Sequence, residues 1–184
     1  MTFEDQHPVA NPASSTSGTK RVVQAVALGA LMAVATAAPA TERTVSVVET
    51  VQLGTSPTKI WTTIRNFDTW QSWHPAFAST QVIRGDGHSK GTVRVLVTQD
   101  GGRFTEELVA FDPAARSYQY RIIESPAPVT DYVSTIQVQE TPAGSTVVWS
   151  SSFNVKPGTT EAEAKKLISG VYRAGLDNLA VVTR

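Results

Sequence analysis

The sequence predicts an α+β domain in which a seven-stranded antiparallel sheet curves around one long C-terminal helix, with two short helices after the first strand. Three observations predict this class. Short runs rich in Val, Ile, Thr and aromatic residues follow one another between residues 44 and 155. The breaks between the later runs carry turn pairs such as Asp-Gly and Gly-Gly, with no helical segment among them. A stripe of apolar residues at helical spacing then ends the chain.

The first strand is expected over residues 44–53. Ser56-Pro57 then starts a helix, because serine caps a helix N-terminus and proline is tolerated in the first turn. Asp68, with Gln71 three residues later, predicts the N-cap of a second short helix that ends before Pro75. Six more strands are expected, over 80–85, 91–99, 103–111, 116–124, 131–139 and 145–155.

The long helix begins at a capping box formed by Thr160 and Glu163. Its apolar stripe consists of Ala164, Leu167, Ile168, Val171, Leu176 and Leu179. This stripe needs a large apolar surface to cover it. The concave face of the curved sheet offers one, so we expect the helix to pack there.

Residues 1–40 have the pattern of a secretory signal peptide. A polar segment over 1–19 has a disordered composition, Lys20-Arg21 follows, and residues 22–40 carry no charge. The segment ends in Ala38-Pro39-Ala40, which has small residues at both recognition positions. We therefore expect cleavage after Ala40 and an exported domain over 41–184, either periplasmic or secreted. The alternative is a retained membrane anchor, since the uncharged segment could nearly span a bilayer.

Composition excludes several classes of function. The 184 residues carry 16 Lys and Arg against 16 Asp and Glu, and zero net charge argues against nucleic-acid binding. The chain has no cysteine, which excludes disulfides and thiol nucleophiles. His74 and His88 lack ligand-like spacing. The glycines at 85, 87 and 91 join two predicted strands rather than a strand and a helix, so neither a phosphate-binding loop nor, despite the spacing Gly87-x-Ser89-x-Gly91, a nucleophile elbow is expected. No metal or cofactor is therefore expected.

One spaced motif and one tyrosine pair carry a resemblance to a known superfamily. They read Trp61-x-x-Ile64-x-x-Phe67-Asp68-x-x-x-x-Trp73-His74-Pro75 and Tyr118-x-Tyr120. These segments resemble the START-like, or birch-pollen-allergen-like (SRPBCC), superfamily. Within it the chain is similar to the polyketide cyclase/dehydrase and lipid-transport group, and in fold to the plant abscisic-acid receptors. The resemblance covers residues 44–182 and implies a helix-grip fold with a deep, mostly apolar cavity closed by loops.

The resemblance also implies where those loops lie. Asp100-Gly101-Gly102 matches a shortened version of the receptors' gate, and Ala127-Pro128-Val129 matches their latch. His74 falls where the receptors have the lysine that holds the hormone's carboxylate. The gate and latch sequences themselves are not retained. Loops that cover a pocket are therefore expected, but abscisic-acid binding is not.

Strand alternation assigns candidate residues to the cavity wall. In 103–111 both faces are mixed, and the resemblance to the plant receptors favours an inward Glu106. Tyr120 and Tyr132 either present hydroxyls to a ligand or only fill the core, whereas Trp61 and Trp149 are expected in the core. The serines at 150–152 suggest a polar wall. The candidate ligand-binding residues are His74, Phe104, Glu106, Leu108, Tyr118, Tyr120, Val129, Tyr132, Ser134, Ser150, Leu167 and Val171.

Two of these residues are also candidates for acid–base chemistry. An imidazole at His74 could bind an acidic ligand or carry a proton, or it could merely end a helix at the surface. An inward Glu106 would be costly unless it is paired or protonated. Its alternatives are contact with a ligand and a structural salt bridge to Arg94 or Arg121.

The function expected from these observations is that of an exported binding protein, whose partner is a small hydrophobic molecule or a lipid. No nucleic-acid partner is expected, and no stable membrane span after signal cleavage. One alternative is a cyclase- or dehydratase-type enzyme that uses Glu106 and His74 as its acid–base pair. Another is an accessory protein of the cell envelope that acts through protein contacts.

Overall fold

The computed structural model of the protein describes residues 44–184. The predicted signal peptide, residues 1–40, lies outside these residues. Within them, no helix has both the length and the apolar character needed to cross a membrane.

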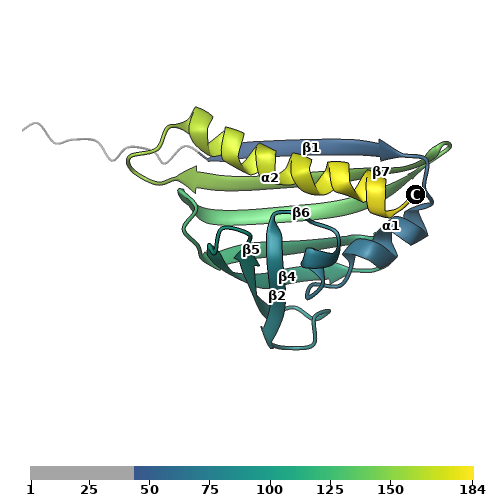
Figure 1. Cartoon of the computed structure of the whole chain (residues 1–184), viewed down its shortest axis with the longest axis horizontal. Helices are drawn as coiled ribbons and strands as arrows, with labels where there is room; N and C mark the ends of the chain where they lie inside the picture. The colour runs from purple at the N-terminus through teal and green to yellow at the C-terminus, as the bar shows by residue number, and fades with distance from the viewer. Residues whose placement is uncertain (1–43) are drawn as a thin grey trace, which may run out of the picture. The chain divides into compact units, whose positions relative to one another are not determined.

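Seven strands form one antiparallel sheet, as predicted (Figure 1). The strand order is β1-β7-β6-β5-β4-β3-β2, so the first strand of the domain pairs with the last. The strands are β1 Val45–Leu53, β2 Phe77–Arg84, β3 Val93–Thr98, β4 Arg103–Asp112, β5 Ser117–Glu124, β6 Val129–Thr141 and β7 Gly144–Val155. Their hairpin connections are short, which is why consecutive strands from β2 to β7 are neighbours in the sheet.

The helix α1, Pro57–Ile64, begins where the sequence predicts it. The hydroxyl of Ser56 accepts a hydrogen bond from the backbone N–H of Lys59, and Pro57 occupies the first turn. The second expected helix is only one 3₁₀ turn, η1, Trp70–Ser72. Its N-cap is Thr69 without a side-chain bond, so Asp68 is not the cap that the sequence suggests. The turn has no room to extend, because proline follows at 75 and β2 begins two residues later.

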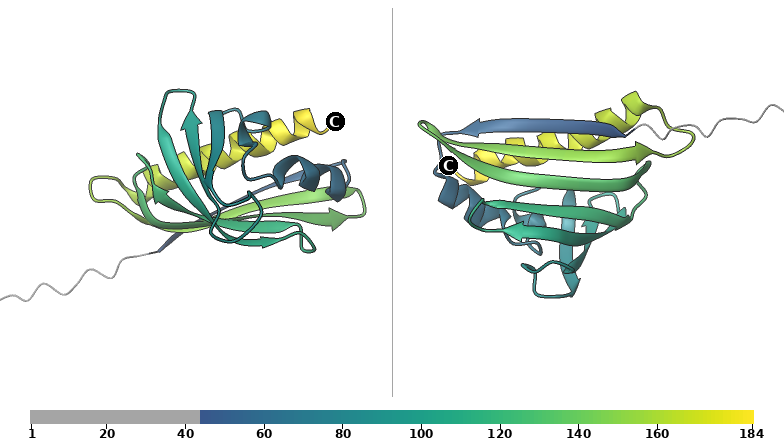
Figure 2. Two further views of the ribbon diagram at one scale, coloured as in Figure 1. Left: turned by 90° about the horizontal axis from the view of Figure 1, so that it is seen from below. Right: turned by 180° about the vertical axis from the view of Figure 1, so that it is seen from behind.

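The long helix α2, Glu161–Val182, crosses the concave side of the sheet. Figure 2 shows α1 on the same side of the sheet. The predicted capping box is present, because Thr160 and Glu163 exchange side-chain and backbone hydrogen bonds. The C-terminal end is tied to the connection between β1 and α1, where the carbonyl of Thr183 accepts a bond of 3.0 Å from the hydroxyl of Thr55. The buried positions of α2 are Ala164, Ile168, Tyr172, Gly175, Leu176 and Leu179.

The hairpin between β6 and β7 brings its turn against the end of β1. Gly144 has a φ of 135°, and a Cβ at this position would collide with the carbonyl oxygen of Leu53. Only glycine satisfies both conditions. This turn therefore leaves room for β1 to pair with β7 at the edge of the sheet.

Candidate functional site

A cavity of about 510 Å³ lies between the sheet and α2. Most of its wall is apolar or aromatic, which is the usual lining of a small-molecule site. It is lined by Trp70, Ala76, Phe77, Thr98, Gln99, Asp100, Gly102, Phe104, Glu106, Tyr120, Ile122, Pro126, Ala127, Pro128, Tyr132, Trp149, Leu167, Ile168, Val171 and Tyr172. The wall therefore combines the inner face of the sheet, the η1 turn, two loops and one side of α2.

Two loops and α2 contribute to one side of the cavity. Asp100 and Gly102 come from the β3–β4 turn, and residues 126–128 come from the β5–β6 connection. Both segments are the ones that the resemblance assigns to covering loops. From α2, Leu167 reaches the cavity while keeping 45% of its surface exposed. This half-exposed leucine marks the place where the cavity meets solvent.

A buried ion pair lies inside the cavity wall. Arg94 on β3 and Glu106 on β4 are direct cross-strand partners. The Nε and Nη2 atoms of Arg94 both donate to Oε2 of Glu106, at 2.9 and 2.6 Å. Of the two partners offered by the sequence, Glu106 therefore takes Arg94. Arg121 pairs instead with Glu107 on the opposite face of the sheet, at 2.6 Å.

The guanidinium of Arg94 is enclosed by the protein. Its Cζ lies 3.7 Å from the ring centroids of both Phe67 and Trp70, and Nη1 donates to the carbonyl of Phe67 at 2.8 Å. Aromatic faces attract such a cation. Glu106 lines the cavity and Arg94 does not. Burial raises the pKa of the Glu106 carboxyl, and the neighbouring guanidinium opposes that rise.

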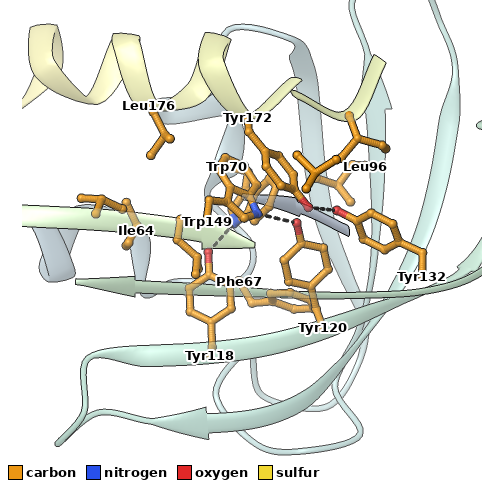
Figure 3. Close-up of a cluster of buried hydrophobic side chains, with 14 of the residues drawn as sticks. Ile64, Phe67, Trp70, Leu96, Tyr118, Tyr120, Tyr132, Trp149, Tyr172 and Leu176 are labelled. Carbon is orange, nitrogen blue, oxygen red and sulfur yellow. Dashed lines mark hydrogen bonds between the residues drawn. The ribbon is translucent and has the colours of Figure 1, made fainter. Parts of the chain in front are cut away.

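Beyond the ion pair, five polar side chains share one hydrogen-bonded cluster. Figure 3 shows the hydroxyls of Tyr120, Tyr132 and Tyr172 converging near the indole of Trp149. The indole N–H of Trp149 lies 3.1 Å from the hydroxyl of Tyr120 and 3.0 Å from that of Ser134. The hydroxyl of Tyr172 bonds those of Tyr132 and Ser134, and its ring stacks on Trp149 at 4.4 Å between centroids.

The acceptors in this cluster fix the direction of its hydrogen bonds. The hydroxyl of Ser134 donates to the carbonyl of Ser150 at 2.9 Å, because a carbonyl can only accept. Tyr172 must then donate to Ser134, and Tyr132 must donate to Tyr172. Burial raises the pKa of Tyr172 to about 12 and that of Tyr132 well above its ordinary value, so both tyrosines remain protonated at neutral pH.

His74 is buried and both of its ring nitrogens are engaged. Nε2 donates to the carbonyl of Val171 at 3.1 Å, and Nδ1 accepts from the backbone N–H of Ala76 at 3.2 Å. The ring stacks on Trp70 with an interplanar angle of 2°. Burial lowers the pKa of His74 to about 4, so the ring is neutral at physiological pH. His74 does not line the cavity, and neither nitrogen is free to face a bound molecule as an acid or base.

Half of the predicted ligand-binding residues lie in the cavity wall. These are Phe104, Glu106, Tyr120, Tyr132, Leu167 and Val171. The inward position of Glu106, favoured by the resemblance, is the one the structure shows.

The other predicted positions lie elsewhere. Leu108 is fully buried in the core, and the hydroxyl of Tyr118 accepts a bond of 3.2 Å from the indole of Trp70. Ser134 does not line the cavity but lies behind Tyr172, to which it is hydrogen-bonded. Val129 lines a separate, more polar cavity of about 490 Å³ between β5 and β6. Ser150 is corrected to the outer face of β7.

The pattern of β7 explains the position of Ser150. Its buried residues alternate through Val147, Trp149, Ser151 and Phe153, so Ser150 and Ser152 point away from the cavity. The bulky apolar side chains of β7 occupy its inner face. The polar wall suggested by the serines is consequently built by tyrosines.

Several lining residues were missed as ligand-binding candidates, and five of these lie on η1, β2, β7 and α2. They are Trp70, Phe77, Trp149, Ile168 and Tyr172. Tyr172 had a usable signal, because it stands four residues after Ile168 and four before Leu176 on the buried stripe of α2. Trp149 was expected only as core, yet its ring serves both the core and the cavity.

Comparisons with known proteins agree with this architecture. The family described as polyketide cyclase/dehydrase and lipid transport matches residues 44–183. The solved structure of XoxI from Bacillus cereus is 33% identical over 76% of this chain and 95% of its own, with a TM-score of 0.70. A Bacillus thuringiensis protein described as uncharacterised is 32% identical over 75% of this chain and 98% of its own, with a TM-score of 0.69.

A more distant structure shares the fold alone. Ara h 8.0201 is 16% identical over 77% of this chain and 98% of its own, with a TM-score of 0.65. The helix-grip architecture is thus common to chains of very different sequence. With its seven-stranded sheet, its long C-terminal helix and a family match across nearly all of the described residues, this chain belongs to the polyketide cyclase/dehydrase and lipid transport family of the SRPBCC superfamily.

Proposed function

We propose that this chain is an exported binding protein that holds a small hydrophobic or amphipathic molecule in the cavity beneath α2. The observation that carries the proposal is the cavity itself, a space of about 510 Å³ with apolar walls and a few polar groups. A site of this kind gains affinity from apolar burial, and a few polar groups fix the orientation of the ligand. Lipids and polyketide-like molecules have the matching chemistry.

The geometry supports binding over acid–base catalysis by the pair named from the sequence. A general base needs a free lone pair within hydrogen-bond reach of the substrate. In His74, Nδ1 accepts a bond from Ala76 and Nε2 carries the proton donated to Val171. Glu106 lines the cavity in an ion pair with Arg94, whereas His74 does not line the cavity, so the two side chains are not placed to act together on one bound molecule.

Export is proposed from the sequence of residues 1–40. A basic pair, an uncharged segment and Ala38-Pro39-Ala40 together support secretion and cleavage after Ala40. The intact mass of the protein recovered from its own host tests this part. A mass equal to that of residues 41–184 is expected, whereas the full-length mass would contradict cleavage.

Native mass spectrometry of the same preparation tests binding. The protein is purified from its own host without detergent, so that a bound molecule is not replaced. A stoichiometric adduct that is lost on unfolding is the expected result, and its mass identifies the class of ligand. A bare protein mass, together with failure of an added apolar fluorophore such as N-phenylnaphthylamine to bind, would overturn the proposal.

A further inference from the structure

We infer that the polar end of the bound molecule is an uncharged hydrogen-bond donor, an alcohol or a phenol, and that the cavity discriminates against carboxylates. The inference rests on the proposed binding function and specifies its ligand. Two observations carry the inference. The first is the atom of the buried ion pair that faces the cavity, and the second is the direction of the hydrogen bonds in the tyrosine cluster.

The charged part of the cavity wall is acidic. Among the described residues that line the cavity, the charged side chains are Asp100 and Glu106, with no Lys, Arg or His. Glu106 is 5% exposed, so water screens its charge weakly. A ligand carboxylate placed beside it would meet a like charge in a setting of low polarity. The wall offers that carboxylate no cation in compensation.

The positive partner of Glu106 is withheld from the ligand. The guanidinium of Arg94 is fully buried, with Phe67 on one face and Trp70 on the other. Three of its N–H groups are used, two by Glu106 and one by the carbonyl of Phe67. Both bonds to Glu106 end on Oε2, so Oε1 receives neither of them. The part of the ion pair that faces the cavity is therefore a hydrogen-bond acceptor, the Oε1 atom of Glu106.

The tyrosine cluster adds further acceptors. The protons of Tyr132, Tyr172 and Ser134 are all committed in one direction, toward the carbonyl of Ser150. Tyr132 lines the cavity, and after giving its proton to Tyr172 its oxygen retains lone pairs. Tyr120 also lines the cavity and accepts from the indole of Trp149, which leaves its own proton outside this series of bonds. Against that one proton stand the lone pairs of Oε1 of Glu106 and of the Tyr132 oxygen, so lone pairs outnumber free protons at this end of the cavity. A ligand with a hydrogen-bond donor satisfies these lone pairs.

Charge balance selects an uncharged donor over a cationic one. Arginine remains protonated at neutral pH, and Glu106 already balances that charge. A bound ammonium ion would add an uncompensated charge to a buried, neutral pair, which is costly. A hydroxyl donates a proton without bringing a net charge.

A matched pair of probes tests the inference on the wild-type protein. Naphthol and naphthoate substituted at the same ring position have nearly the same size and differ in charge at neutral pH. Each is titrated against bound N-phenylnaphthylamine, whose displacement is followed by fluorescence. We expect naphthol to bind at least about tenfold more tightly than naphthoate, as one like-charge contact or one unsatisfied group would produce. Equal or tighter binding of naphthoate would overturn the inference while leaving the binding function intact.

A charge-free variant then locates the selectivity. Arg94→Met combined with Glu106→Gln removes both charges together, so neither position is left with an uncompensated buried charge. The ratio of the two affinities is expected to fall to within about threefold of unity, since the like-charge penalty is gone. Glu107→Gln, on the outer face of the same strand, is the matched control and keeps the wild-type ratio. A variant that binds N-phenylnaphthylamine and retains the full wild-type selectivity would contradict the assignment to Glu106.

Discussion

Arg94 and Glu106 stand directly opposite each other on β3 and β4, joined by two hydrogen bonds to a single carboxylate oxygen. Arg94 is fully buried and Glu106 nearly so. The pair therefore lies between the packed core of the domain and its cavity. The guanidinium is packed into the aromatic core by Phe67 and Trp70, and the carboxylate forms part of the cavity wall.

Breaking this pair on one side should destabilise the fold strongly. Glu106→Gln leaves a permanently charged guanidinium in the core without its counter-ion, so the free energy of unfolding is expected to fall by about 3–5 kcal/mol. Urea denaturation at neutral pH measures the change. Glu107→Gln, one residue along the strand, breaks an ion pair with the half-exposed Arg121 and should cost about 0–1 kcal/mol. Equal losses in the two variants would show that the buried pair has no special structural weight.

Two glycines of α2 should respond oppositely to the same substitution. A Cβ at Gly175 would lie 2.5 Å from Cδ2 of His74 and 2.9 Å from Cζ3 of Trp149. Gly175→Ala is therefore expected to destabilise the protein by about 1–3 kcal/mol through overpacking. A Cβ at Gly170 meets no atom within 4 Å, so Gly170→Ala should stabilise the helix by about 1 kcal/mol.

Thermal unfolding of the two variants measures this contrast. The midpoint is expected to fall for Gly175→Ala and to rise for Gly170→Ala. A rise in both would mean that α2 does not press on the ring of His74.

His74 should make stability depend on pH. Its pKa is about 4 in the folded protein and 6.5 as an ordinary value, so the unfolded chain binds the extra proton between these limits. The contribution of the neutral ring is complete above pH 6.5 and is lost as the pH falls toward 4, by about 3 kcal/mol. His74→Gln should remove that part of the pH dependence. Urea denaturation of the wild-type and His74→Gln proteins between about pH 4 and 7 measures the profile, and an unchanged profile in folded His74→Gln would contradict this assignment.

Most of the fold follows from local patterns. The hairpin signals predict the antiparallel order, Ser56 and Thr160 predict the starts of the two helices, and each agrees with the structure. The prediction of a second helix capped by Asp68 was wrong, because a good capping residue cannot extend a helix that Pro75 and the start of β2 cut short. Local rules predict where an element begins better than how long it can continue.

The cavity was harder to predict because its wall is built from residues far apart in the sequence. The resemblance to the plant receptors, and not alternation, favoured an inward Glu106 on β4, whereas alternation along β5 assigned Tyr120 to the cavity wall; both residues line the cavity. His74 was expected to contact a ligand or to end a helix at the surface, yet it is buried and donates to the carbonyl of Val171 on α2, 97 residues away. Tyr172 was missed because the hydrogen-bond partners of its hydroxyl, Tyr132 and Ser134, lie 40 and 38 residues away in the sequence.

The central claim is that the space under α2 is a binding site, and a cavity-filling substitution tests it most directly. Val171 lines the cavity, whereas Val181 on the same helix is 58% exposed. N-phenylnaphthylamine is titrated against the wild-type protein, Val171→Trp and Val181→Trp, and circular dichroism confirms that each is folded. The account predicts that Val171→Trp loses at least about tenfold in affinity, because the indole occupies the space of the probe, and that Val181→Trp binds like the wild type. Unchanged binding by a folded Val171→Trp protein would contradict the account.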